Sequence, residues 1–355
     1  MDQSFPVLIS QTLIAFTIEH DNVWEARYWL RADPAPLRTS LVMWANFVRF
    51  LPEEGISVRE LSQKAGYPPG KAHPDLTGMI RWRYVTVDSQ NVKKPKLGDR
   101  IMPTERALEA AQTWIPLAAE IEKRWEKRFG SDKISRMKGL LIEMIKQFDQ
   151  QMPHYFPVLY HLRGMSVPTP HEPESDPTET LALPYLLSQV HLLFTLEANQ
   201  LSDLSLVIRA NVLRVSGLDP ISKKELPQLS GISKEALSMC INYLKKRELM
   251  VEEPGSDGKG KFIRLTEAGL FEKNRYSEIV QTVEDNWLAK LPEGLYLELH
   301  QTLLEVVQPE VGADSPLFDA LILPHPDLWR AKEPKRRVLP HHPMVLYRGG
   351  WPDGS

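Results

Sequence analysis

Apolar residues between positions 201 and 249 recur with the spacing of helices. Residues 201–215 place apolar side chains on one face of a predicted helix, namely Leu204, Val207, Ile208, Leu213 and Val215. A short helix is predicted next, with Ser222 and Glu225 as a capping box and Gly231 as its C-cap. Ser233 then caps another helix, whose apolar face is formed by Leu237, Cys240, Ile241 and Leu244. This order predicts a helix-turn-helix.

A predicted hairpin and two further helices follow. The stretch "LMVEEPGSDGKGKFIRLT" has two strand-like runs around a loop rich in Gly, Pro and Asp, which is typical of a β-hairpin. A long helix is predicted from Glu267 to about Lys290, and a last one from Pro292 to Val307. A helix-turn-helix followed by a hairpin predicts a winged helix.

The same pattern occurs earlier in the chain. The stretch "SLVMWANFVRFLPEEGISVRELSQKAG" (40–66) aligns without a gap with "SLVIRANVLRVSGLDPISKKELPQLSG" (205–231), with 12 identical residues in 27 positions. Upstream, "AFTIEHDN" (15–22) parallels "LFTLEANQ" (193–200). Downstream, Thr104 pairs with Thr266, and Trp125 pairs with Trp287. An internal repeat of this length indicates two related units.

The first copy has the same predicted elements with one abnormal helix. Ser57 and Glu60 repeat the capping box, and "RYVTVDSQNVKKPKLGDRIMPT" repeats the hairpin before a long helix that starts at Thr104. Ser131 is expected to cap a helix with the apolar stripe Ile134, Met137, Leu140, Leu141, Met144, Ile145 and Phe148. Pro74 falls where the interior of the second helix is expected, at a cost of about 3 kcal/mol. We therefore expect that helix to be late, short or kinked.

This order of elements resembles the multiple-antibiotic-resistance regulator (MarR) family. The segment "FIRLTEAG" (262–269) is similar to that family's step from the wing into a long helix, and the resemblance covers nearly all of 10–150 and 185–308. It implies a mainly α fold with small β-hairpin wings (α+β). Because two family chains pair to bind DNA, it also implies that this chain is an intramolecular pseudo-dimer. The family's acidic-basic Asp-x-Arg motif is not clearly present in either wing.

Composition and the proline-rich stretches divide the chain into parts. A length of 355 residues, 42% of them hydrophobic and 25% charged, suits two globular domains. We expect a first winged-helix domain at 1–152, a Pro-rich linker at 153–180, a second winged-helix domain at 181–308 and a Pro-rich tail at 309–355. The tail holds Met344, Val345, Leu346, Tyr347 and Trp351, so we expect it to pack on one of the domains.

The chain is expected to be cytoplasmic. Cys240 is the only cysteine, so no intrachain disulfide can form and a reducing compartment fits best. The N-terminal residues show no signal-peptide pattern, and no apolar run approaches the length of a membrane span. We expect no association with a membrane.

Basic residues gather in both predicted winged helices although the chain's net charge is −3. Seven basic and three acidic residues give +4 over 66–104, and seven basic and five acidic residues give +2 over 231–266. Candidates to face a DNA groove in the second copy are Ser233, Lys234, Ser238 and Asn242. Further DNA-binding candidates are Lys245, Lys246, Lys259, Lys261 and Arg264, and in the first copy Lys71, Lys93, Lys94, Lys96 and Arg100. The alternative for each is an ordinary helix cap or a solvated side chain.

Other residues allow two interpretations. Trp24, Tyr28, Trp29 and Trp44 either line a pocket for a small aromatic effector, as the family resemblance implies, or belong to the core. Cys240 is expected to be a buried apolar residue, whereas a redox sensor would need exposure and a lowered pKa. The pair His341-His342 lacks the spaced partners of a zinc site, so we expect no metal.

The sequence favours a regulator over an enzyme. It contains no Gly-rich phosphate loop, His-Glu-x-x-His motif or Gly-x-Ser-x-Gly elbow, so we expect neither catalysis nor a cofactor. The prediction is a sequence-specific transcriptional regulator, a repressor, that binds double-stranded DNA as a monomeric pseudo-dimer. Because its two winged helices differ, its operator is expected to be non-palindromic. The alternative is a winged-helix module for protein–protein interaction, with weak or no DNA binding.

Overall fold

The computed structural model describes residues 4–29, 48–64, 74–89, 95–150, 181–255, 260–308, 315–322 and 338–343. The elements of the first half are α1 (Phe5–Trp29), β1 (Ile56–Ser57), α3 (Val58–Lys64), α4 (Pro74–Arg81), β2 (Val85–Asp88), β3 (Arg100–Pro103), α5 (Glu105–Trp114), α6 (Leu117–Phe129) and α7 (Ser131–Lys146). Those of the second half are α8 (Leu183–Gln200), α9 (Leu206–Ile208), the π-helix η2 (Arg209–Leu213), β4 (Ile221–Ser222), α10 (Leu226–Ser230), α11 (Lys234–Lys246), β5 (Met250–Pro254), β6 (Lys261–Leu265), α12 (Glu267–Lys290), α13 (Leu295–Val307) and the 3-10 helix η3 (Pro316–Leu321).

The described chain is mostly helical and contains two small antiparallel sheets, an arrangement compatible with an α+β winged-helix fold. The sheet orders are β1-β3-β2 and β4-β6-β5. Ile101 lies between Ile56 and Val87 in the first sheet, just as Ile263 lies between Ile221 and Glu252 in the second. The two sheets therefore have the same strand order and corresponding registers.

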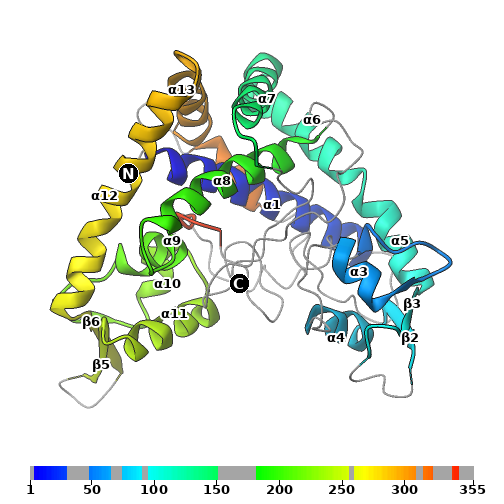
Figure 1. Ribbon diagram of the computed structural model, residues 1–355, viewed down its shortest axis with the longest axis horizontal. Helices are drawn as coiled ribbons and strands as arrows, with labels where there is room; N and C mark the ends of the chain where they lie inside the picture. The colour runs from blue at the N-terminus through cyan, green and yellow to red at the C-terminus, as the bar shows by residue number, and fades with distance from the viewer. Residues whose placement is uncertain are drawn as a thin grey trace.

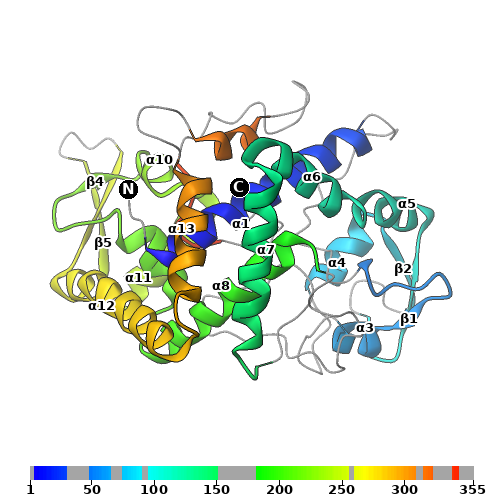
Figure 2. The same cartoon turned by 90° about the horizontal axis from the view of Figure 1, so that it is seen from above.

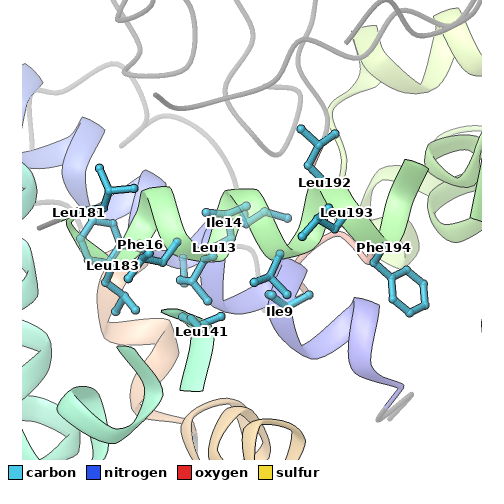
Figure 3. Close-up of a cluster of buried hydrophobic side chains, with 14 of the residues drawn as sticks. Ile9, Leu13, Ile14, Phe16, Leu141, Leu181, Leu183, Leu192, Leu193 and Phe194 are labelled. Atoms are coloured by element: carbon cyan, nitrogen blue, oxygen red, sulfur yellow. The ribbon is translucent and has the colours of Figure 1, made fainter. Parts of the chain in front are cut away.

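One buried cluster joins most helices at the centre of the molecule. Helices α1 and α8 contact each other, and α7 and α13 pack beside them (Figures 1 and 2). Figure 3 shows Leu13 and Phe16 of α1 near Leu183 of α8 and Leu141 of α7. Most of the described side chains of α1 are buried, apolar ones in its first half and polar ones such as His20, Asp21 and Asn22 in its second.

The two winged helices relate differently to this central core. The apolar residues of the first one, such as Val58, Met79 and Ile101, belong to the central cluster itself. Those of the second form a separate cluster, which includes Leu226, Leu237 and Ile263. The first winged helix is thus continuous with the centre, whereas the second has a core of its own.

Several predicted helix ends are confirmed. In the first copy the capping box has Glu60 N–H donating to Ser57 Oγ at 3.1 Å and Ser57 N–H donating to Glu60 Oε2 at 3.1 Å. Gly231 ends α10 in the left-handed conformation (φ 78°), and Ser233 caps α11 by accepting from Ala236 N–H at 3.1 Å. These ends fit the sequence because each residue type suits its cap position.

Other predicted ends are wrong. Ser222 and Glu225 form no capping box, because residues 223–225 make a turn and α10 begins at Leu226. The long helix predicted from Thr104 is two helices, α5 and α6, with Pro116 between them, where the missing N–H interrupts the helical hydrogen bonds.

Two further helices begin at residues other than those predicted, α7 one residue earlier and α13 three residues later. Ser131 is the first helical residue of α7, and its N-cap is Gly130. The last helix begins at Leu295 rather than Pro292, because Gly294 at its N-cap is left-handed (φ 82°).

The two halves also share an uncommon backbone conformation. Arg83 (φ 59°) and Glu248 (φ 58°) are the non-glycine residues with positive φ in the described part of the chain. Each follows the second helix of its winged helix, and the two stand 165 positions apart, the offset of the sequence repeat. A left-handed turn therefore leads from helix to strand in both halves.

A piece of the C-terminal tail packs against the second half. Asn211 Oδ1 accepts from the backbone N–H of His341 at 3.0 Å and of His342 at 3.1 Å, and Asn211 Nδ2 donates to His342 O at 2.9 Å. The His342 ring lies 4.5 Å from that of His191 on α8. Residues 338–343 thus bridge α8 and η2.

Within the described ranges, no helix combines the length and the apolar character that crossing a membrane would require.

Candidate nucleic-acid interface

Helices α4 and α11 lie along the same side of the molecule. Figure 1 shows both at its lower edge, with the sheet β4-β6-β5 at one lower corner and the sheet β1-β3-β2 at the other. Helices α7 and α13 occupy the opposite end. The second helix and the hairpin of each half therefore face a common direction.

The sequence of α11 gives it one buried and one exposed face. Its buried residues recur every three or four positions and are Ala236, Leu237, Cys240, Ile241 and Leu244. Among the predicted groove-facing residues, Lys234 and Asn242 are exposed and Ser238 is half-buried. Ser233 differs, because its hydroxyl caps the helix and the residue is only 3% exposed. Its side chain offers little surface to a partner.

Three lysines gather around one carboxylate beside the end of α11. Lys245 Nζ lies 2.6 Å from Glu252 Oε2, while Lys261 Nζ and Lys223 Nζ lie 3.3 Å and 3.4 Å from Glu252 Oε1. The hydrogen bond from Lys245, followed by those from Lys261 and Lys223, lowers the pKa of Glu252 to about 2. We call Lys223, Lys245, Lys261 and Glu252 the lysine cluster.

Sequence reasoning missed two members of the lysine cluster. Lys245 and Lys261 were DNA-binding candidates, whereas Lys223 and Glu252 were not. The register supplies a partial signal: Glu252 pairs with Ile263 and Pro254 with Lys261, so Glu252 and Lys261 share a face of the sheet. Nothing in the local pattern brings Lys223, some 30 positions away, to the same carboxylate.

Arg264, also a predicted contact, is engaged within its hairpin. Its Nη2 lies 2.8 Å from Glu253 Oε1, and both side chains are partly exposed. The charge of Arg264 is therefore shared with an adjacent carboxylate. Lys246 is exposed in the last turn of α11, and Lys259 lies outside the described residues.

The first copy presents a different set of groups. The described part of its second helix, α4, runs from Pro74 to Arg81, and residues 65–73 lie outside the described ranges, so a late or short helix stays a prediction. Arg100 Nη2 donates to the backbone oxygen of Glu54 at 2.7 Å, so its guanidinium is used within the fold. Lys96 is exposed. Lys71, Lys93 and Lys94 lie outside the described residues.

The aromatic residues proposed for an effector pocket are placed in part. Trp24 is buried within the central cluster, which favours the interpretation as core for that residue. The backbones of Tyr28 and Trp29 belong to α1, but their side chains lie outside the described part of the structure, as does all of Trp44. An aromatic effector stays a prediction.

Cys240 is fully buried on the inner face of α11, and burial raises the pKa of its thiol to about 12. The prediction of a small buried apolar residue is confirmed. A redox sensor needs an accessible thiol with a lowered pKa, which is the opposite environment.

A buried arginine connects the second winged helix to α12. Arg209 on η2 is fully buried, pairs with the Glu272 carboxylate and donates to the Glu272 backbone oxygen and to Ser202 Oγ. Nothing in the sequence pattern distinguishes Arg209 from an exposed arginine. A π-helical turn is rare and often marks a functional position.

The chain has low similarity to known proteins. No family model matches the chain, and no curated protein matches it. A transcriptional regulator of the MarR family from Rhodococcus sp. RHA1 is similar to part of it, with 18% sequence identity and a TM-score of 0.29 over 35% of this chain and 93% of that one. A likeness at this level is too low to argue from.

Proposed function

We propose that the chain is a DNA-binding transcriptional regulator that holds one duplex against both of its winged helices. A winged helix binds DNA with its second helix in the major groove and its wing along the backbone. The observation that carries the proposal is the position of α4 and α11 on one side of the molecule, each beside its own hairpin (Figure 1).

In this proposal the two halves form an intramolecular pseudo-dimer. The identical order of the two sheets supports it, and so do the left-handed turns at Arg83 and Glu248. The contact between α1 and α8, each at the start of its half, also supports it. The chain then needs no second copy and is monomeric on DNA.

The second winged helix supplies the clearest recognition surface. Lys234, Ser238 and Asn242 occupy the outward face of α11 and are the proposed groove contacts. Asn suits a bidentate contact to adenine, and Lys a contact to guanine. Lys245, Lys246 and Lys261 are the proposed backbone contacts, because their exposed ammonium groups suit phosphate.

The operator is proposed to be non-palindromic. Asn242 and Lys245 of α11 correspond at the repeat offset to Thr77 and Ile80 of α4, and the first hairpin has Arg100 bonded within the fold. Unequal helices present unequal groups to DNA, so the half-sites differ, with a spacing of roughly 10 base pairs. A bound duplex is sterically closed to other proteins, and repression is therefore the proposed outcome.

Binding of duplex DNA over a series of salt concentrations tests the proposal. Phosphate contacts by lysine and arginine make the logarithm of the affinity fall linearly with the logarithm of the salt concentration. A selection from random duplexes should then return a site with two unlike halves. Absence of salt-dependent binding favours the module for protein–protein interaction, and a perfect inverted repeat contradicts unequal recognition.

A further inference from the structure

The lysine cluster brings together groups from separate elements. Lys223 follows β4, Lys245 lies in the last turn of α11, Lys261 begins β6, and Glu252 is in the middle of β5. All three ammonium groups are within 3.4 Å of one carboxylate. Three positive charges against one negative charge leave a concentrated net charge of +2.

The carboxylate is covered while the lysines reach solvent. The Glu252 side chain is 11% exposed, whereas the Lys261 side chain is 67% exposed and that of Lys245 is 38% exposed. Each ammonium group has three donors, and Glu252 has two acceptor oxygens for all of them. Some N–H donors of the three lysines are therefore left for an anion from solution to bind.

The fold itself does not require this cluster, because the first copy forms the same framework without it. Lys223 N–H donates to Lys261 O at 2.9 Å, and in the first copy Val58 N–H donates to Asp99 O at 3.0 Å. Val58 and Asp99 therefore correspond to Lys223 and Lys261.

Strand register and sequence offset identify the other two counterparts. Val87 pairs with Ile101 as Glu252 pairs with Ile263, and Ile80 stands at the repeat offset from Lys245. The first copy thus has two valines, one isoleucine and one aspartate where the second has three lysines and one glutamate.

We propose that Lys223, Lys245 and Lys261 form a binding site for a phosphate group of the DNA backbone, with Glu252 as the residue that positions the three ammonium groups. The site deepens the proposed function and rests on it. A non-bridging phosphate oxygen is an anionic acceptor like a carboxylate oxygen, and Lys binds phosphate as a point charge. Since the first copy has Asp99 in place of Lys261, the second winged helix anchors the duplex.

The test measures the salt dependence of binding to a labelled duplex by fluorescence anisotropy, using the full chain. Lys223→Met removes one charge and keeps the apolar stem, so the log–log slope should become shallower by about 0.9. Glu252→Gln removes the internal counter-charge but keeps an acceptor oxygen and adds no phosphate contact, so binding at low salt should become tighter while the slope stays at the wild-type value. Lys127→Met is the matched control and should change neither, because this exposed lysine is on α6, a helix on the side of the molecule opposite α4 and α11 (Figure 1).

The outcomes separate this inference from the proposed function. If the wild-type chain shows no salt-dependent binding, both fail. If the wild type binds with a steep slope and Lys223→Met keeps that slope, only the phosphate site is overturned, and the cluster is a structural ion-pair network. Should Glu252→Gln not fold, as seen by circular dichroism, Lys223→Met decides the question, because Lys223 is a partly exposed side chain outside the hydrophobic core.

Discussion

The indole Nε1 of Trp125 donates a hydrogen bond to Glu19 Oε2 at 2.8 Å. Trp287 and Glu197 make the same hydrogen bond, also at 2.8 Å, at the positions that the repeat aligns. Each indole lies against a phenylalanine from the first helix of its half, Phe16 at 5.2 Å or Phe194 at 5.4 Å between ring centroids. In each half the first helix is thus tied to a later one through a polar contact, which is buried in the first half and partly buried in the second.

Loss of the Glu19 carboxylate should destabilise the protein. Glu19 also accepts from Arg128 at 2.8 Å, so Glu19→Ala leaves a buried indole N–H and a guanidinium without their acceptor. The free energy of unfolding should fall by about 2 kcal/mol, because a buried donor without a partner keeps its desolvation cost. Urea denaturation measures it, and Glu197→Ala should have a similar effect. A loss below about 0.5 kcal/mol would show that the contact contributes no more than a surface substitution does.

Gly231→Ala should disturb the tail as well as the turn. Gly231 has φ 78°, and a Cβ there would lie 2.7 Å from Val338 O and 2.8 Å from Leu339 C. Gly294→Ala is the matched control, since its φ is 82° but, among the described residues, a Cβ would meet only Glu298 Oε1, at 3.8 Å. Both variants bear the left-handed strain of about 1 kcal/mol, and Gly231→Ala should lose more. Thermal unfolding gives the difference, and equal losses would mean that the tail does not press on the turn.

Stability should decrease as the pH falls from about 6.5 to about 4. Burial lowers the pKa of His342 from 6.5 to about 4 and also lowers that of His191, with His342 as the second cause for the latter. Neutral histidines are therefore favoured in the folded state, and the unfolded state binds protons first as acid is added. His342 alone corresponds to roughly 3 kcal/mol over this range. Urea midpoints measured against pH should fall, and His342→Gln should flatten the curve between these values.

Cys240 should be inert in the folded protein. Its thiol is fully buried and its pKa is raised to about 12, so almost no thiolate forms near neutral pH. A chromogenic thiol reagent should react with it only after denaturant is added. Treatment with hydrogen peroxide should leave DNA binding unchanged, and rapid labelling of the native chain would contradict this.

Local sequence signals were sufficient where one residue determines one conformation. Gly231 and Ser233 take the cap positions predicted for them, the apolar face of α11 is buried, and the stripe of α7 is buried at Ile134, Met137, Leu141 and Met144. The predicted capping box at Ser222 is absent, because residues 223–225 form a turn instead of the first turn of the helix. Tertiary contacts can override such a local preference.

Contacts between distant positions could not be predicted. Lys223 reaches Glu252 only once β4 has paired with β6, and Arg209 reaches Glu272 only once η2 has packed on α12. The residues next to a lysine or arginine in the sequence do not show whether its charge is solvated or paired with a distant carboxylate. The repeat does predict which positions correspond, and the Trp125–Glu19 and Trp287–Glu197 pairs lie at aligned positions.

Because the second winged helix has a separate core, the two winged helices are attached to the central helices in different ways. The first winged helix shares its apolar cluster with the central helices, so moving it would separate apolar side chains that now pack together. The second keeps its own core, and Arg209 with Glu272 and the bonds of the tail residues to Asn211 are among its links to the rest of the molecule. In the proposed complex with a bent or overwound duplex, the first winged helix would then keep its orientation to the central helices, and the second would be the one that changes orientation.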